Sequence, residues 1–125
     1  MNLLLDTHTL IWVLEDQANL SSAAFEAMHD GENTVFVSSV AAWEIAIKRK
    51  IGKLTATFDY HNTLRLYRFE PLAITAEHAL ATENLPLHHH DPFDRLLIAQ
   101  AQVESLTLVS RDGIFEAYEV SLIKA

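Results

Sequence analysis

Two aspartates lie at the ends of apolar runs that are typical of buried strands. Asp6 comes after the run at 3–5, and Asp112 follows the run at 108–110 by one residue. The working site of an open α/β fold lies outside the carboxyl ends of its strands, so both carboxylates are candidates for such a site. Either aspartate taken alone also fits an ordinary turn or helix N-cap, where this residue type is favoured.

Glu44 is a third candidate, because it falls inside a predicted helix from Val40 to about Ile51. We expect the apolar stripe of that helix to consist of Val40, Trp43, Ile47 and Ile51. Glu44 lies within this stripe, so its carboxylate is expected to be directed towards the interior. A desolvated carboxylate is costly unless a cation or good donors meet it, which predicts either a metal or a basic partner such as Arg95.

Asp94 is the fourth candidate and lies in the first turn of another predicted helix. Asp91 is expected to cap this helix and Pro92 to occupy its first position, which places Asp94 at the third. An acid there stabilises the helix dipole without any further function. Because Asp91 already supplies the cap, Asp94 is free to point towards the edge of the sheet where Asp6 and Asp112 are expected.

Four carboxylates in one cleft would repel one another and raise one another's pKa values unless cations neutralised them. All four offer oxygen, and the chain has no cysteine to offer sulfur. Oxygen ligands suit Mg²⁺ or Mn²⁺ better than zinc or copper. A carboxylate-held metal, or a pair of metals, can activate water and orient a phosphodiester for hydrolysis.

The elements that must position these acids alternate between strand and helix along the whole chain. Strands are expected at 3–5, 34–37, 71–74, 107–110 and 119–123, and helices at 10–14, 22–29, 40–51, 59–68, 76–84 and 91–101. This alternation implies right-handed crossovers and a mainly parallel sheet covered by helices on both faces. All 125 residues fit a single domain, 1–125, of the α/β class.

The composition excludes several classes of protein. Without cysteine, a disulfide scaffold and Cys-ligated zinc or iron–sulfur sites are ruled out. The longest apolar run, at 10–14, is far short of the roughly 18 residues of a membrane span, so we expect a soluble cytoplasmic protein with no membrane partner. The net charge of −8, from 17 acidic and 9 basic residues, argues against broad electrostatic binding of nucleic acid.

Four segments of the sequence, in order, resemble the PIN-domain ribonucleases, specifically the VapC-type toxins of bacterial toxin–antitoxin pairs. They are LLLDTH at 3–8, WEIAIK with GKL at 43–48 and 52–54, DPFDRLLIAQA at 91–101, and LVSRD at 108–112. Each motif is weak by itself, but the four together at these spacings are specific. The resemblance extends from residue 3 to about residue 120 and leaves no second domain unexplained.

This resemblance implies a three-layer PIN-like fold with a parallel sheet of about five strands. It also implies an endoribonuclease that uses Mg²⁺ or Mn²⁺ and a metal-activated water, leaving a 5′-phosphate and a 3′-hydroxyl. The family's catalytic and metal-binding acids correspond by position to Asp6, Glu44, Asp94 and Asp112, of which Asp112 is the least certain ligand. Thr7 and Ser110 correspond to supporting positions. The implied partners are RNA, a cognate VapB-type antitoxin protein and a second copy of the chain in a homodimer.

Two clusters outside the acidic quartet have both an ordinary and a functional interpretation. The basic residues Lys48, Arg49, Lys50 and Lys53 fit a solvated helix end, which the helix dipole favours, or a contact for RNA phosphates. The run His88, His89 and His90 cannot easily present three imidazoles to one ion. We therefore expect a solvated loop or an RNA-facing surface there, in preference to a soft-metal site.

Two other functions remain as alternatives. A receiver-type signalling domain is also doubly wound with acids at strand ends, but it needs a paired acid after the first strand and a lysine at the end of a late one. Here Asp6 is single and the segment 107–111 contains no lysine. A catalytically silent PIN-like module that serves protein binding is disfavoured by the intact acidic quartet.

Overall fold

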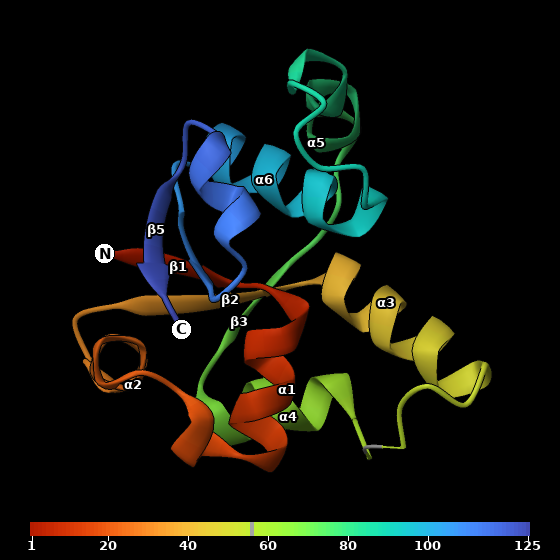
Figure 1. The fold of residues 1–125 in the computed structure, drawn as a ribbon. Coiled ribbons are helices and arrows are strands. Elements are labelled where there is room, and N and C mark those ends of the chain that lie inside the picture. The colour runs from red at the N-terminus through yellow and green to blue at the C-terminus, as the bar shows by residue number, and fades with distance from the viewer. Residues whose placement is uncertain (56) are drawn as a thin grey trace.

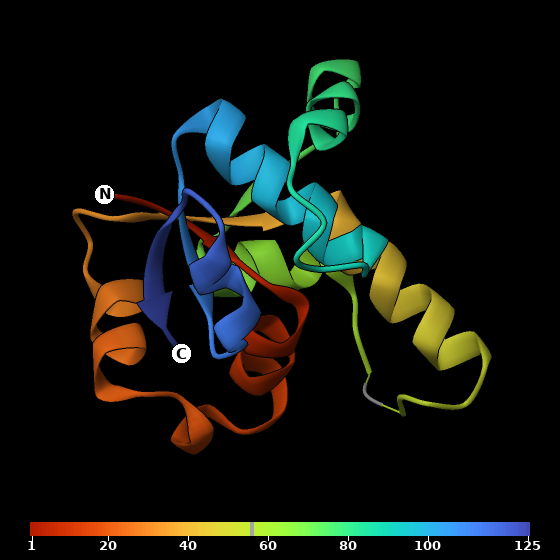
Figure 2. The same ribbon diagram turned by 45° about the horizontal axis from the view of Figure 1, so that its top comes forward.

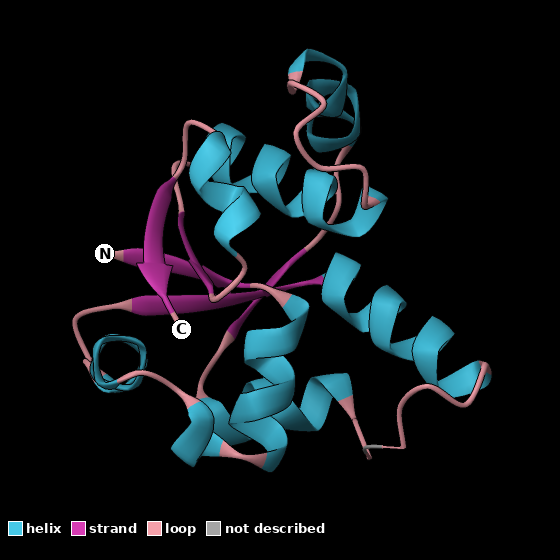
Figure 3. Cartoon of the chain, in the orientation of Figure 1, coloured by secondary structure: helices cyan, strands magenta, loops and turns pink. Residues whose placement is uncertain are grey.

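The apolar run at the start of the chain forms β1 (Asn2–Leu5), the central strand of a parallel sheet. The computed structural model describes residues 1–55 and 57–125, and in these residues five strands lie in the order β3-β2-β1-β4-β5 (Figures 1 and 3). The other strands are β2 (Thr34–Ser38), β3 (Glu70–Leu72), β4 (Thr107–Ser110) and β5 (Ser121–Lys124). Every neighbouring pair is parallel, so the predicted fold class is confirmed.

Helices cover both faces of the sheet. They are α1 (Thr7–Glu15), α2 (Ser22–His29), α3 (Ser39–Lys50), α4 (Tyr60–Tyr67), α5 (Ala76–Ala81) and α6 (Pro92–Glu104). Short 3₁₀ helices, η1 (Gln17–Asn19), η2 (Thr82–Asn84) and η3 (Gly113–Ala117), join them. Helices α1, α2 and α4 lie on one side of the sheet, whereas α5, α6 and η3 lie on the other (Figures 1 and 2). No helix in the described part of the chain has the length and apolar character needed to cross a bilayer.

The core divides into two clusters because β1 is buried on both faces. Leu3 and Leu5 belong to the cluster beneath α1 and α2, whereas Leu4 belongs to the cluster beneath α6. All three side chains are fully buried. Successive side chains of a strand point to opposite faces, so a continuous apolar run is what a central parallel strand requires.

The helix boundaries follow the capping signals in the sequence. Ser38 caps α3 by accepting the amide hydrogen of Val40 at 3.0 Å, and α3 ends just before Gly52. Gly52 has a φ of +78°, the left-handed conformation that commonly terminates helices and that glycine adopts without strain. Asp91 caps α6, with Pro92 as its first residue, as predicted. These boundaries place the N-termini of α1, α3 and α6 near the carboxyl ends of β1 and β2 (Figure 1).

The predicted orientation of α3 is wrong. Trp43, Ile47 and Ile51 were expected to face the interior, but they are 55%, 36% and 59% exposed. The buried face of α3 instead comprises Val40, Ala41, Glu44 and Ile45. The helix carries apolar residues on two adjacent faces, and the face with the smaller side chains packs inwards against α1 and α6. Glu44 is nevertheless buried, because it belongs to this inner face.

Candidate functional site

Asp6 lies at the junction between β1 and α1 and is only 4% exposed. Its Oδ1 accepts a hydrogen bond from the backbone amide of Thr9 at 2.9 Å, which makes Asp6 the N-cap of α1. Its Oδ2 accepts a hydrogen bond from Ser110 Oγ, at the end of β4, at 2.5 Å. A carboxylate has about four lone-pair positions, so both oxygens keep capacity for a cation. The cap and the candidate ligand are therefore compatible uses of the same side chain.

Glu44 is 5% exposed, and both of its oxygens have partners. Thr7 Oγ1 donates a hydrogen bond to Oε1 at 2.7 Å. Lys48 Nζ lies 2.8 Å from Oε2, one helical turn along α3, and its side chain is 32% exposed. The basic partner is therefore Lys48 and not Arg95, the example that the sequence suggested. The Arg95 guanidinium donates instead to four backbone carbonyls of the segment 82–89.

Asp91 and Asp94 have separate functions at the start of α6. Asp91 Oδ1 accepts hydrogen bonds from the amides of Phe93 and Asp94, at 2.8 and 3.2 Å, so its predicted capping role is confirmed. The Asp94 carboxylate is left to make a different contact, 2.7 Å from Oδ2 to His89 Nε2. An ionised carboxylate only accepts hydrogen bonds, so the imidazole donates here.

Asp94 is the acid that the fold perturbs most clearly. Burial raises the pKa of Asp94 from its ordinary value of 3.8 to about 6. The hydrogen bond and charge of His89 oppose this rise in pKa, and the negative charges of Asp91 and Asp6 add to it. A carboxylate held in such surroundings is ionised at neutral pH at a cost in folding free energy, and a bound cation would relieve that cost.

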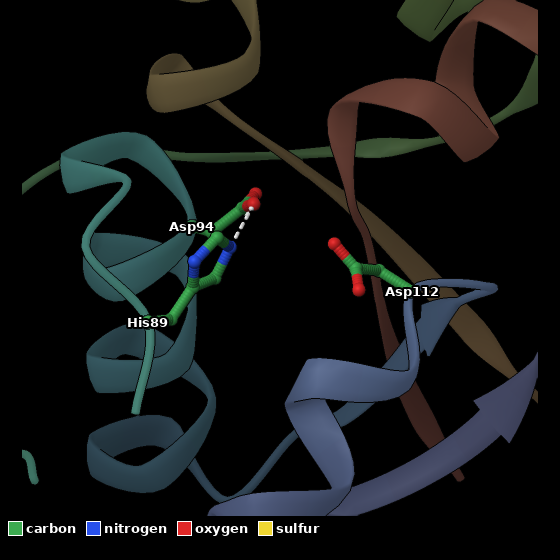
Figure 4. Close-up of side chains that lie close together, drawn as sticks. All are labelled: His89, Asp94 and Asp112. Atoms are coloured by element: carbon green, nitrogen blue, oxygen red, sulfur yellow. Dashed lines mark hydrogen bonds and ion pairs between the residues drawn. The ribbon is translucent and has the colours of Figure 1, made fainter. Parts of the chain in front are cut away.

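Asp112 faces Asp94 and His89 across the candidate site, as Figure 4 shows. The three residues each offer a ligand atom, and these atoms lie within 4.8 Å of one another. Asp112 is exposed and caps η3 through a 3.1 Å hydrogen bond from the amide of Ile114 to its Oδ1. It comes from the turn after β4, whereas the other two residues come from the start of α6 and the loop before it.

The remaining two acids lie outside this group in the described structure. The set of ligand atoms within reach of one ion contains neither Asp6 nor Glu44. Asp6 is linked to Asp112 through Ser110, whose Oγ donates to Asp6 and accepts the amide hydrogen of Asp112 at 3.1 Å. Glu44 is linked to the segment after Asp6 through Thr7. Hydrogen bonds thus connect Asp6 with Asp112 through Ser110, whereas Asp94 and Asp112 are the two acids close enough to share an ion.

His89 belongs to this group of ligand atoms, although the sequence named it only as one of three consecutive histidines. His88 and His90 are exposed, as expected for a solvated loop, but His89 is half-buried and bonded to Asp94. Its backbone amide donates to Tyr118 Oη at 2.8 Å, which fastens the loop against the turn after η3. The sequence offered only a run of histidines five residues before Asp94, and the direction of each ring depends on the path of the loop.

The predicted basic patch lies along the last turn of α3 and beyond it, at the end that extends away from the sheet (Figure 1). Lys50 and Lys53 are exposed, whereas Lys48 is engaged by Glu44. Arg49 Nη1 makes a long 3.4 Å hydrogen bond to the carbonyl of Phe58. The patch therefore presents exposed cations at its outer end and an ion pair at its inner end.

A comparison with protein families agrees with this geometry. The model of the PIN domain family matches residues 3–120, which is nearly the whole chain. The chain belongs to the PIN domain family. This membership confirms the family that the sequence motifs resemble and decides against a receiver-type signalling domain. No curated protein sequence matches the chain.

Solved structures with the same PIN fold include components of several complexes. One is VapBC2 from Rickettsia felis bound to a fragment of promoter DNA, with a TM-score of 0.70, 18% identity and 98% coverage of both chains. Another is a toxin–antitoxin complex from Klebsiella pneumoniae, with a TM-score of 0.64 and 18% identity over 97% of this chain and 95% of the other. A third is FitAcB from Neisseria gonorrhoeae, with a TM-score of 0.69 and 22% identity over 98% and 96%. At these identities the similarity is one of fold.

Proposed function

We propose that this PIN-domain chain is a metal-dependent endoribonuclease that acts as the toxin of a toxin–antitoxin pair. The observation that carries the proposal is the convergence of Asp94, Asp112 and His89, with ligand atoms within 4.8 Å, beside the buried carboxylates that follow β1 and line α3. This group lies at the carboxyl edge of a parallel sheet, where α/β folds place their working sites.

The donor set fits a hard divalent cation. Two carboxylates face each other with no thiolate among the ligands, and His89 Nε2 donates to Asp94 and so cannot itself bind a cation, which suits Mg²⁺ or Mn²⁺. Asp94 and Asp112 would hold the ion, and Asp6 and Glu44 complete the acidic surroundings as further metal-binding and catalytic residues. When bound, such a cation supplies Lewis-acid polarisation of a phosphate and lowers the pKa of a water molecule.

The residues around the acids keep them in position. Ser110 fixes Asp6 through its 2.5 Å hydrogen bond, and Thr7 fixes Glu44 through its 2.7 Å hydrogen bond. His89 holds Asp94 in the same way and sets the direction in which the free oxygen of Asp94 points. Hydrogen bonds to the ligands of a metal site typically affect its metal affinity by about 10- to 100-fold. Lys48 pairs with Glu44, and a divalent cation bound at that carboxylate would compete with this ion pair.

RNA is the proposed substrate, cleaved to leave a 5′-phosphate and a 3′-hydroxyl. The support for nucleic-acid binding is local, because the chain as a whole carries a net charge of −8. Lys50 and Lys53 are exposed at the end of α3, and with Arg49 and Lys48 they offer a place for RNA phosphates. Association should therefore depend on this patch and on the bound metal, and not on long-range attraction.

The toxin assignment implies a partner protein. Similar PIN folds occur in complexes described as VapBC2 and as a toxin–antitoxin complex. We propose that this chain is likewise neutralised by a VapB-type antitoxin and that it acts in the cytoplasm. Expression of the chain alone should then arrest bacterial growth, and the Asp94→Asn variant should not. Growth arrest by both forms would contradict an effect that depends on the site.

Homodimerisation is also proposed. Its support is the exposed line of Trp43, Ile47 and Ile51 on α3, which places large apolar side chains in water. Sedimentation of the purified chain should give twice the mass of 14.1 kDa, and Ile47→Asp should shift the equilibrium towards the single chain. A single-chain mass for the unmodified protein at micromolar concentration would contradict the dimer.

The nuclease proposal is tested by incubating the purified chain with end-labelled single-stranded RNA in Mg²⁺, in Mn²⁺ and in EDTA. We expect cleavage in either metal, no cleavage in EDTA, and products that carry a 5′-phosphate. Equal cleavage with and without EDTA would contradict a metal-dependent reaction.

A further inference from the structure

A shallow hollow beside the acidic site has a lining that the proposed metal chemistry does not use. Its lining residues are the acids Asp6 and Asp112 together with His8, Trp12 and Arg111. The two acids belong to the site already described. The other three residues are planar groups, two of them aromatic rings from successive turns of α1 and one a guanidinium from the turn after β4.

The guanidinium of Arg111 lies over the ring of Trp12 and is held there by hydrogen bonds. Its central carbon is 4.2 Å from the centre of the Trp12 ring. Its Nε donates to the carbonyl of Ala125 at 2.9 Å, its Nη1 donates to Asn19 Oδ1 at 3.1 Å, and its Nη2 donates to the carbonyl of Asn19. A guanidinium has five N–H donors, so two of them have no partner among residues 1–55 and 57–125. Arg111 is exposed, although its position is fixed by these contacts.

His8 extends the same surface by one helical turn. Its ring centre is 6.3 Å from that of Trp12, with the two planes tilted by 39°. His8 is exposed, and Trp12 is half-buried against the core. The guanidinium of Arg111 and the ring of His8 therefore both lie beside the Trp12 ring, in a hollow that Asp6 and Asp112 also line.

We infer that this hollow is a subsite for one unpaired nucleotide of the RNA, whose base stacks on the Trp12–Arg111 pair and against His8; the inference rests on the proposed ribonuclease function. Bases of single-stranded RNA are commonly bound by stacking on aromatic rings or on arginine guanidinium planes. The two N–H donors of Arg111 that have no partner among the described residues would be available to the base edge or to the adjoining phosphate. Because the chain carries a net charge of −8, stacking would add affinity to the local phosphate contacts at the basic patch.

The subsite also predicts a preference for single-stranded RNA over duplex RNA. A base can enter the hollow only when it is unstacked from its neighbours, which a duplex does not allow. The nucleotide next to the cleaved phosphate should therefore come from a loop or another single-stranded region. Stacking accepts any base, so this subsite selects for strandedness more than for sequence.

Trp12 itself reports on the subsite, because the chain contains only two tryptophans. The Trp43→Phe variant leaves Trp12 as the only tryptophan of the chain. Its fluorescence is measured while a hexamer of adenosine ribonucleotides is added, with Ca²⁺ in place of Mg²⁺. A hexamer of abasic ribose phosphates is the matched probe without bases. We expect the adenosine hexamer to quench Trp12 and the abasic hexamer to leave its emission unchanged.

Two substitutions test the same point without altering the core. His8→Ala and Arg111→Gln should each raise the dissociation constant of the adenosine hexamer by roughly five- to a hundredfold, the loss expected for one stacked base. His61→Ala, an exposed histidine on α4, is the matched control and should change nothing. Circular dichroism and the Tm of each variant are measured as well. An unchanged spectrum and Tm for Arg111→Gln would show that its weaker binding does not come from the lost contacts with Asn19 and Ala125.

Cleavage of a longer RNA in Mg²⁺ separates this inference from the proposed function. If the Trp43→Phe protein cleaves RNA but Trp12 is not quenched, or if His8→Ala binds the hexamer as tightly as its parent, the subsite is refuted and the nuclease stands. The hexamer could instead quench Trp12, and His8→Ala could weaken hexamer binding, while no RNA is cleaved. In that case the subsite stands and the nuclease is refuted. Quenching by the abasic hexamer equal to that by adenosine would overturn base stacking.

Discussion

The Asp94→Asn substitution is expected to stabilise the metal-free protein. In the folded chain the pKa of Asp94 is about 6, compared with its ordinary value of 3.8, mainly because the carboxyl is buried. Folding with this group ionised therefore costs free energy that an uncharged asparagine does not require. The amide keeps an oxygen that can still accept the hydrogen bond from His89.

The size of this effect follows from the pKa difference. A difference of about two pKa units corresponds to about 3 kcal/mol, since one unit corresponds to about 1.4 kcal/mol. The side chain is 19% exposed, so solvent screening reduces this value only in part. At pH 7.5 in EDTA we expect the variant to be more stable by about 2–3 kcal/mol. For a chain of this size, that is roughly 10 °C in Tm.

The pH dependence gives the sign of the effect. Because the folded-state pKa is raised, the folded chain binds this proton more tightly than the unfolded chain, and this group lowers wild-type stability as the pH rises from 4 to 6. The difference between variant and wild type should be full well above pH 6, should decrease between pH 6 and pH 4, and should vanish below pH 3.8.

Urea unfolding at several pH values measures this difference directly. Asp112→Asn is the matched control, because it removes a second charge of the same cluster from an exposed position and asparagine caps η3 equally well. We expect the control to change stability little at any pH. The reasoning would be refuted if the Asp94→Asn protein were no more stable than wild type at pH 7.5. It would also be refuted if the gain in unfolding free energy at pH 4 were as large as the gain at pH 7.5.

Three further perturbations have definite expected outcomes. Ser110→Ala removes the hydrogen bond to the buried Oδ2 of Asp6 and should lower the unfolding free energy by about 1–3 kcal/mol, measured by urea unfolding at pH 7; unchanged stability would contradict that contact. Gln100→Leu leaves the buried hydroxyl of Ser38 without its 2.6 Å acceptor and should cost a similar amount, whereas a more stable variant would show that α3 does not depend on this bond. Millimolar Mg²⁺ or Mn²⁺ should raise the Tm of wild type by binding to the folded state, and the same Tm in EDTA and in metal would count against a cation site.

The positions of the strands and helices were largely predictable, because local signals determine them. The unbroken apolar run before Asp6 predicts a strand buried on both faces, and it forms the centre of the sheet. The sequence of Asp91 and Pro92 predicts the start of α6 to the residue, since a capping side chain and a fixed φ act only on their immediate neighbours.

Features that depend on tertiary packing were not predictable in the same way. The apolar residues of α3 occupy two adjacent faces, and the sequence does not show that Ala41 and Ile45 pack inwards while Trp43 points outwards. Likewise, the hydrogen bond between His89 and Asp94 depends on the path of a loop fastened by Tyr118, which lies 29 residues further along the chain. The candidate acids were thus identified from local patterns, but their orienting partners were only partly identified.

The central claim is that RNA cleavage depends on a cation held by Asp94 and its neighbours. The most direct measurement is a titration of Mn²⁺ into wild type and Asp94→Asn at pH 7.5, with heat of binding and RNA cleavage rate recorded on the same samples. We predict that the cleavage rate of wild type rises in proportion to metal occupancy, and that the variant binds Mn²⁺ much more weakly and cleaves little RNA. The claim would be contradicted if the variant cleaved RNA at the wild-type rate, or if wild type cleaved RNA before any Mn²⁺ was bound.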